Sequence, residues 1–381
     1  MVNRIIKPAI SETKKSVLLL GPRQAGKSTL VGELKADLHI NLADELEFLN
    51  HSSRPGDLAR LIKLEDARTV FIDEVQRLPR ILNTVQALVD QNKKLKFYLT
   101  GSSARKLKRG GANLLPGRVL NFRLGPLVAA EMDYKLETEK ALSRGTLPEP
   151  YLENQAKAAE QLLKSYVANY LKEEIKAEAL TRNLESFARF INEAILSVGE
   201  FIDLTKLAKK AKVSRHAIPR YFEILEDTLI GYRVFPYPQL TEPQDLIRHP
   251  KFYLFDNGVY NGMLQNFKPS ADRIGPLAEQ LVFSQIVHSA WAREIDMNLW
   301  TFRTRKGVEV DFVVEAGSKV FGIEVKTSDN ISIDDCEGLI HFKKAEAQGA
   351  ECFILHMGTS ERKFGPVWSM PWQKGLQRMG L

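Results

Sequence analysis

One stretch near the N-terminus restricts the fold more than any other part of the chain. A strand-like apolar run over 16–20 is followed by Gly21-Pro-Arg-Gln-Ala-Gly-Lys-Ser28, and a helix-compatible run extends over 27–38. The pattern Gly-x-x-x-x-Gly-Lys-Ser in this setting is typical of a phosphate-binding loop. Its glycines let backbone N–H groups turn inward toward phosphate oxygens. The stretch therefore predicts an α/β domain in which strand, loop and helix follow one another.

The residues of this loop have separate expected roles. Lys27 is expected to reach the β- and γ-phosphates of ATP, and the Ser28 hydroxyl is expected to bind Mg²⁺. The other predicted nucleotide-binding positions are Gly21, Pro22, Arg23, Gln24, Ala25, Gly26 and Thr29. A chance turn before a helix is the alternative, and the complete motif argues against it.

Carboxylates and hydroxyls follow two further strand-like runs. The run 69–72 ends in Asp73 and Glu74, and the run 95–99 ends in Thr-Gly-Ser-Ser. Ligands of open α/β sheets bind outside the carboxyl ends of the strands. Asp73 is expected to hold Mg²⁺ through water, and Glu74 is expected to deprotonate the attacking water; the alternative is an acidic helix cap. Either Ser102 or Ser103 would sense the γ-phosphate, and the sequence does not choose between them.

These motifs resemble a prokaryotic group of AAA+ ATPases fused to an uncharacterised C-terminal domain of restriction-endonuclease-like fold. The similarity covers nearly the whole chain and is strongest at Gly21–Ser28, Phe71–Pro79, Leu99–Ser102 and Pro116–Arg118. The resemblance implies a homo-oligomer, with a hexamer as the first expectation. It also implies an arginine, just before the fifth core strand, that reaches the ATP of a neighbouring subunit.

Arg118 is the candidate for that arginine because it precedes a plausible fifth strand over 119–124. Such a residue stabilises charge on the transferring phosphoryl group and contributes about 10³–10⁵ in rate. An ordinary surface arginine is the alternative interpretation. Arg23, inside the loop, is a rival for a phosphate or subunit contact.

Composition limits the class of protein. The 381 residues can form two or three domains, and no apolar run approaches the roughly 18 residues that span a bilayer. The N-terminus lacks a secretory pattern, and two cysteines are too few for a disulfide framework. We expect a soluble cytoplasmic protein with no membrane partner. The net charge of +7 favours an anionic partner without identifying it.

The segment 203–237 has the organisation of a winged helix. A short helix over 204–211, a turn at 212–214, a second helix over 215–229 and a wing strand over 231–237 are expected, with Pro219 favouring a late helix start. The side chains expected to contact DNA are Lys206, Lys209, Lys210, Lys212, Arg215, His216 and Arg220. Packing against other domains or subunits is the alternative.

A strand hairpin over 307–326 contains charged residues at regular spacing. Alternation along a strand places Glu324 and Lys326 on one face, and the hairpin brings Asp311 near them. Two carboxylates, Asp311 and Glu324, can share a divalent ion while a lysine polarises the attacking water. The block resembles the restriction-endonuclease-like superfamily, whose members often add a glutamate from a preceding helix, here Glu279. The alternative is a nuclease-like fold that only holds DNA or protein.

The sequence thus predicts an α/β chain in three parts. These are an AAA+ P-loop ATPase core (1–145), a helical and winged-helix region (146–248) and a restriction-endonuclease-like domain (249–381). The predicted function is Mg²⁺-dependent ATP hydrolysis coupled to DNA binding, remodelling or translocation, with DNA cleavage open. The competing hypothesis is a nucleotide-switch signalling or scaffold ATPase whose nuclease-like domain binds a partner protein.

Overall fold

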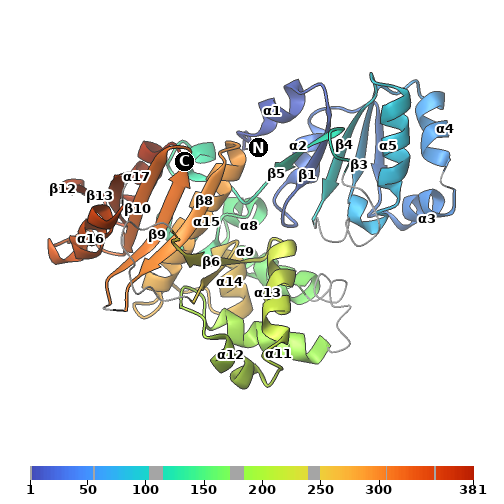
Figure 1. Cartoon of the computed structure of the whole chain (residues 1–381). Helices are drawn as coiled ribbons and strands as arrows, with labels where there is room; N and C mark the ends of the chain where they lie inside the picture. The colour runs from blue at the N-terminus through green and yellow to red at the C-terminus, as the bar shows by residue number, and fades with distance from the viewer. Residues whose placement is uncertain are drawn as a thin grey trace. The chain divides into compact units, whose positions relative to one another are not determined.

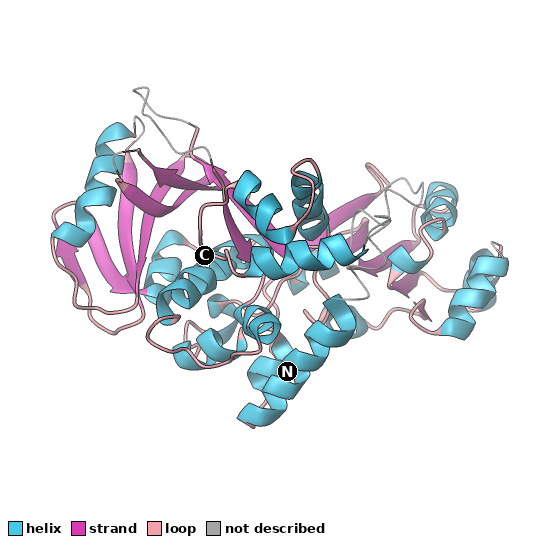
Figure 2. Cartoon of the chain, turned by 90° about the horizontal axis from the view of Figure 1, so that it is seen from below, coloured by secondary structure: helices cyan, strands magenta, loops and turns pink. Residues whose placement is uncertain are grey.

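The computed structural model describes residues 2–54, 56–102, 115–171, 184–238, 249–305, 307–346 and 349–381. Its contacts divide the chain into two compact units (Figure 1). The N-terminal unit comprises Met1–Pro126 with Asp227–Leu229, and the C-terminal unit comprises Leu127–Glu226 with Ile230–Leu381. Both units contain helices and strands, and Figure 2 colours the chain by these two kinds of element.

The N-terminal unit contains a five-stranded parallel sheet in the order β2-β3-β4-β1-β5. The strands are β1 (Ser16–Leu20), β2 (Leu38–Asn41), β3 (Thr69–Asp73), β4 (Lys96–Gly101) and β5 (Val119–Arg123). The helices are α1 (Lys7–Glu12), α2 (Lys27–Gly32), α3 (Glu45–Ser53), α4 (Asp57–Leu64), η1 (Val75–Arg77) and α5 (Ile81–Gln91). This arrangement confirms the predicted α/β class for this part of the chain.

Both faces of this sheet are covered. Successive side chains of β1 point to opposite faces, so Leu18 and Leu20 pack in a core with α5, while Val17 and Leu19 pack with α1 and α2. Every residue of β1 is buried. A strand that is buried on both faces is expected to be apolar throughout, as this one is from Val17 onward.

One predicted helix is shorter than expected. The helix assigned to 27–38 ends at Gly32, and β2 begins at Leu38. Lys35 adopts a left-handed conformation, with φ of 51°, which stops a right-handed helix. The chain then extends so that Leu38 can pair with Val70 of β3. Tertiary pairing thus overrides the helix-compatible pattern of these residues.

The C-terminal unit contains an eight-stranded mixed sheet in the order β12-β13-β11-β10-β9-β8-β6-β7. Its strands are β6 (Gly231–Pro236), β7 (Lys251–Leu254), β8 (Met297–Arg303), β9 (Glu309–Ala316), β10 (Lys319–Lys326), β11 (Ala350–His356), β12 (Arg362–Phe364) and β13 (Val367–Pro371). The predicted hairpin is confirmed: β9 and β10 pair antiparallel, with Val313 opposite Gly322.

Helices lie on both faces of this sheet. The long α15 (Ile274–Ala292) stacks Phe283 on Tyr253 of β7, whereas α16 (Glu337–Ala345) packs Phe342 against Phe302 of β8. The helices before β6 are η2 (Ala129–Met132), α7 (Thr138–Arg144), α8 (Pro148–Leu152), α9 (Ala156–Ser165), the π-helix η3 (Tyr166–Leu171), α11 (Leu184–Ile195), α12 (Leu204–Ala211) and α13 (Ala217–Asp227). The later ones are α14 (Asn257–Leu264), α15 (Ile274–Ala292), η4 (Asp334–Cys336), α16 (Glu337–Ala345) and α17 (Trp372–Met379).

The predicted winged-helix segment is only partly as expected. Its two helices form, and α13 begins at Ala217, two residues later than the predicted start at Arg215, with Pro219 in its first turn. The expected wing strand, β6, pairs with both β7 and β8 inside the eight-stranded sheet. It therefore does not project as a free wing. The winged-helix and restriction-endonuclease-like assignments remain predictions.

Ser103, the alternative sensor, falls outside the described residues. The predicted domain boundaries at 145 and 248 also remain predictions. Among the described residues, no helix combines the length and apolar character needed to cross a membrane.

Candidate functional site

The predicted nucleotide-binding residues meet at one edge of the five-stranded sheet. Because β1, β3 and β4 are parallel, their carboxyl ends lie together, with Leu20 beside Gly101 and Ile72 beside Leu99. The Gly21 N–H donates to the Gly101 carbonyl at 3.2 Å, which joins the start of the loop to the end of β4. The structure thus brings the loop, the Asp73–Glu74 pair and Ser102 to the same edge.

Two glycines are required by the geometry of the loop. A Cβ on Gly21 would lie 2.0 Å from the Leu124 carbonyl oxygen, so no other residue fits there without movement of the backbone. Gly26, which precedes α2, has a φ of 92°, a conformation that L side chains rarely adopt. Gln24 also has a positive φ, 57°. These turns are the kind of backbone that cradles phosphate oxygens.

Lys27 is buried in the centre of this loop. Only 4% of it is exposed, and its Nζ donates to the carbonyl oxygens of Gly21 and Pro22 at 3.0 Å each. The hydroxyl-bearing Ser28 and Thr29 are exposed in the first turn of α2. A fixed ammonium beside exposed hydroxyls fits a nucleotide phosphate with its Mg²⁺.

Arg4 holds the loop through hydrogen bonds to backbone carbonyls, and the sequence analysis did not identify this residue. Its buried guanidinium donates to the Ala25 carbonyl at 2.7 Å and to the Gly125 carbonyl at 2.8 Å, with a longer bond of 3.3 Å to the Pro126 carbonyl. These partners lie 21 to 122 residues away in the chain. No local pattern could reveal such a pairing.

Asp73 is placed to hold a cation. Its Oδ1 accepts from the Thr100 hydroxyl and from the Glu74 N–H, the latter at 3.1 Å. Among the described contacts both hydrogen bonds use Oδ1, so Oδ2 is available for a water-bound Mg²⁺. The donor set fits Mg²⁺, which prefers one or two carboxylates together with water and phosphate oxygens. Bound there, the ion would neutralise charge on the phosphates.

Glu74 belongs to a short side-chain network. Its backbone is left-handed, with φ of 58°, an unusual conformation that costs on the order of 1 kcal/mol for a non-glycine residue. Its carboxylate accepts from the Gln76 amide, and the same amide donates to the Ser102 hydroxyl at 3.0 Å. Gln76 therefore joins the predicted base to the predicted sensor. The sequence analysis did not identify Gln76, and its position two residues after Glu74 is the signal that could have done so.

Arg118 immediately precedes β5, as predicted. Its guanidinium forms a two-pronged ion pair with Asp90 of α5, with Nε–Oδ1 and Nη2–Oδ2 distances of 2.9 and 2.8 Å. The hydrogen bonds from Arg118 lower the pKa of Asp90. Surface ion pairs of this kind contribute little to stability because water and salt screen them. Asp90 therefore orients Arg118 without holding it tightly.

In the C-terminal unit, two of the four predicted residues, Glu279 and Asp311, contact a lysine that the sequence analysis did not single out. Lys251 Nζ lies 2.9 Å from Glu279 Oε1 and 3.3 Å from Asp311 Oδ1. It also lies 2.9 Å from Glu309 Oε1. Lys326 Nζ contacts Glu324 Oε1 at 3.1 Å, which confirms their shared face.

Burial dominates the electrostatics of this carboxylate cluster. Burial and the Asp311 charge raise the pKa of Glu279 to about 7 and that of Glu324 to about 8. Burial alone would lower the pKa of Lys251, but Asp311, Glu279 and Glu309 offset it, so its pKa lies above its usual value. The lysine therefore stays charged at neutral pH.

A second feature of the C-terminal unit is a cationic surface on α12, α13 and the turn between them. All seven side chains predicted to contact DNA are exposed: Lys206, Lys209, Lys210, Lys212, Arg215, His216 and Arg220. Within the part of the chain that the structure describes, no ion pair neutralises the six lysines and arginines of this set. Such a surface attracts the backbone of a nucleic acid.

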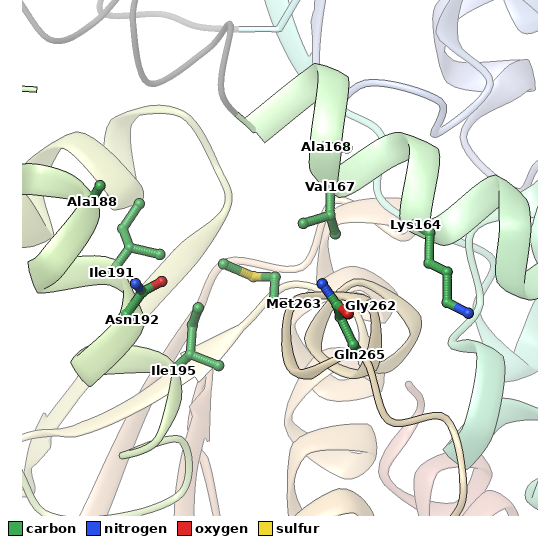
Figure 3. A pocket seen from close by; sticks show the side chains of 10 residues that line it. All are labelled: Lys164, Val167, Ala168, Ala188, Ile191, Asn192, Ile195, Gly262, Met263 and Gln265. Carbon is green, nitrogen blue, oxygen red and sulfur yellow. The ribbon is translucent and has the colours of Figure 1, made fainter. Parts of the chain in front are cut away.

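A pocket of about 300 Å³ lies between η3, α11 and α14 (Figure 3). Figure 3 shows Val167, Ile191, Ile195 and Met263 around one space, with Lys164, Asn192 and Gln265 among the polar lining residues. The mostly apolar lining is unlike that of a phosphate site. The pocket therefore differs in its chemistry from the nucleotide-binding loop.

Comparison with protein families finds matches for three successive regions of the chain. Residues 13–133 match the model of an AAA domain, residues 136–270 match a domain of unknown function (DUF8612), and residues 274–374 match another (DUF4143). The chain therefore combines a region that matches an AAA domain with two regions that match domains of unknown function. Together, the match and the loop geometry support a nucleotide-binding ATPase.

Two relatives that match most of the chain are named as uncharacterized proteins. An uncharacterized protein of Mycobacterium tuberculosis is 26% identical over 333 residues, covering 83% of this chain and 71% of its own. One from Haemophilus influenzae is 21% identical, covering 86% of each chain. A solved structure of the replication initiator DnaA, bound to AMPPCP and single-stranded DNA, matches 58% of this chain and 85% of its own. Its identity is 10% and its TM-score is 0.25.

The nucleotide site predicts opposite effects for two substitutions. Lys27→Ala should weaken ATP binding because the buried ammonium is lost, whereas Glu74→Gln should retain ATP and lower kcat by about 10²–10⁴-fold. Equilibrium binding of a fluorescent ATP analogue and a phosphate-release assay measure the two effects. Lys14→Ala, at an exposed position, is the control. Hydrolysis by Glu74→Gln at the unaltered rate would exclude Glu74 as the base.

Gln76→Ala should lower kcat about tenfold or more and leave KM for ATP nearly unchanged, because Glu74 loses the amide that orients it. Gln91→Ala, which removes an exposed glutamine at the end of α5, is the matched control. Steady-state phosphate release at several ATP concentrations separates kcat from KM. Equal kcat for Gln76→Ala and Gln91→Ala would show that Gln76 has no positioning role.

Proposed function

We propose that this protein hydrolyses ATP with Mg²⁺ and couples hydrolysis to work on DNA. The observation that carries the ATPase proposal is the meeting of a buried loop lysine with Asp73 and the Glu74–Gln76–Ser102 network at one sheet edge. Lys27 binds the β- and γ-phosphates, Ser28 and Asp73 bind Mg²⁺, and Glu74 deprotonates water. The loop backbone from Gly21 to Thr29 binds the nucleotide.

Hydrolysis in this proposal requires a neighbouring copy of the chain. Arg118 enters the neighbour's site and stabilises charge on the γ-phosphate, so the working form is a homo-oligomer, with a hexamer as the first expectation. The support is the position of Arg118 before β5 and its weak surface ion pair with Asp90, which costs little to exchange. The cytoplasmic location expected from the sequence stays a prediction.

The DNA proposal is supported by the exposed cationic side chains of α12, α13 and their connecting turn. Lysine and arginine contacts to phosphates release condensed counterions, so binding of this kind is independent of base sequence and sensitive to salt. The C-terminal carboxylates could cut the bound DNA or only help to fold the domain that grips it. The salt bridges of Lys251 favour gripping without cleavage.

Arg118→Ala should lower ATP turnover by about 10³-fold or more and leave ATP affinity nearly intact, because a finger acts on the transition state. Asp90→Asn is the control, since it removes only the surface partner of Arg118 and should keep most activity. Mixing Arg118→Ala with Glu74→Gln should restore part of the turnover, as some interfaces regain both groups. Turnover by a strictly monomeric species, independent of protein concentration, would contradict this proposal.

Charge reversal on the cationic surface should weaken DNA binding. Lys209→Glu with Arg220→Glu should lower affinity for unrelated DNA sequences and flatten the dependence of log Kd on log salt, with basal ATPase unchanged. Fluorescence anisotropy at several salt concentrations measures this effect. Lys157→Glu with Lys319→Glu changes the net charge equally at exposed positions elsewhere in the unit.

The same protein preparations test whether DNA stimulates ATP hydrolysis and whether the protein cleaves DNA. ATP turnover should rise when DNA is added, and neither Mg²⁺ nor Mn²⁺ should permit nicking of duplex, single-stranded or branched DNA. Nicking that disappears in Asp311→Ala and Lys326→Ala would establish a nuclease instead. Absence of both DNA binding at low salt and stimulation of ATPase would favour a nucleotide-switch protein with a protein partner.

A further inference from the structure

The carboxylate cluster of the C-terminal unit surrounds a buried cation that belongs to the chain itself. Lys251 is the first residue of β7, and 4% of its side chain is exposed. Its ammonium lies within 3.3 Å of carboxylate oxygens from three residues: Glu279 of α15 and Glu309 and Asp311 of β9. An ammonium has three N–H donors, and here each has a carboxylate.

Lys251 and its carboxylate partners are held in place by one aromatic ring, one tyrosine hydroxyl and two backbone contacts. Lys251 Nζ lies 5.2 Å from the centre of the Phe201 ring, and the two residues also form an antiparallel bridge. The Tyr253 hydroxyl donates to Glu279, and the Val325 N–H donates to Asp311 Oδ2 at 2.9 Å. The ammonium is therefore held on several sides and is not a mobile surface group.

A divalent ion does not fit beside this ammonium. Ca²⁺ and Mg²⁺ lie about 2.0–2.6 Å from their oxygen ligands, and the centre of the three carboxylates is already occupied by Nζ. Within the described ranges, no three histidine, cysteine, aspartate or glutamate side chains are arranged to hold a metal ion. The ammonium therefore takes the position between Glu279, Glu309 and Asp311, while the metal predicted for Asp311 and Glu324 stays a prediction.

We propose that Lys251 is a built-in substitute for a divalent metal, so the Glu279–Glu309–Asp311 cluster is a permanent ion-pair network and not a metal-dependent catalytic centre. Removal of the ammonium should let the same three carboxylates move together around a divalent ion. The proposal does not depend on ATP hydrolysis or DNA binding. It concerns only which cation balances these carboxylates.

The test measures Mn²⁺ binding to the full chain without nucleotide. All proteins carry Asp73→Asn, which removes the predicted Mg²⁺ ligand of the N-terminal unit. Calorimetry and electron paramagnetic resonance should detect no tight Mn²⁺ site with Lys251 present and one site per chain in Lys251→Ala. Lys251→Met, which keeps most of the side-chain volume, should bind Mn²⁺ more weakly than Lys251→Ala. Adding Asp311→Asn to Lys251→Ala should weaken Mn²⁺ binding by at least tenfold.

Thermal unfolding provides a second measurement in case the lysine variants are unstable. Mn²⁺ should raise the Tm of Lys251→Ala in a concentration-dependent way and should leave the Tm of the Lys251 protein unchanged. A stoichiometric Mn²⁺ site in the Lys251 protein that Asp311→Asn abolishes would overturn the proposal. The proposal would also be overturned if folded Lys251 variants did not bind Mn²⁺, or if Mn²⁺ did not restore the fold of unfolded variants. In either case the position vacated by the ammonium would have failed to accept a divalent ion.

Discussion

The burial of β1 on both faces is the constraint on which the nucleotide site depends. A strand without a solvent-facing side can carry polar function only at its ends, and its carboxyl end opens directly into the loop at Gly21. The neighbouring strands β3 and β4 run in the same direction, so Asp73 and Ser102 arrive at that edge as well. Three segments far apart in sequence thereby converge through strand direction alone, and side-chain hydrogen bonds then adjust their orientation.

The C-terminal unit differs from the N-terminal unit because it buries several carboxylates close together. Carboxylates that leave water must be protonated or paired with a cation. Here Lys251 supplies a cation for three of them, while Lys326 pairs with Glu324. A buried ion pair stabilises a fold little overall, but loss of one partner is costly, about 3–5 kcal/mol. A lysine in this place therefore makes the cluster intolerant of change without implying any reaction.

The sequence predicted features whose information is local and missed those that depend on long-range partners. The loop around Lys27 and the hairpin with Glu324 could be predicted because glycine spacing and strand alternation act within a few residues. Arg4 and Lys251 could not, because their partners lie 21 to 122 and 28 to 60 residues away, and neither has a distinctive neighbour in sequence. The helix assigned to 27–38 was too long because pairing of Leu38 with β3 overrides local preference.

Arg4 also links two parts of the N-terminal unit mechanically. One guanidinium bonds the Ala25 carbonyl inside the loop and the carbonyls of Gly125 and Pro126, the last residues of that unit's first segment. A displacement of the loop backbone by a fraction of an ångström would strain or release these bonds together. One side chain thus ties the loop directly to the peptide at which the chain leaves the unit, so the two segments cannot move independently without loss of these hydrogen bonds.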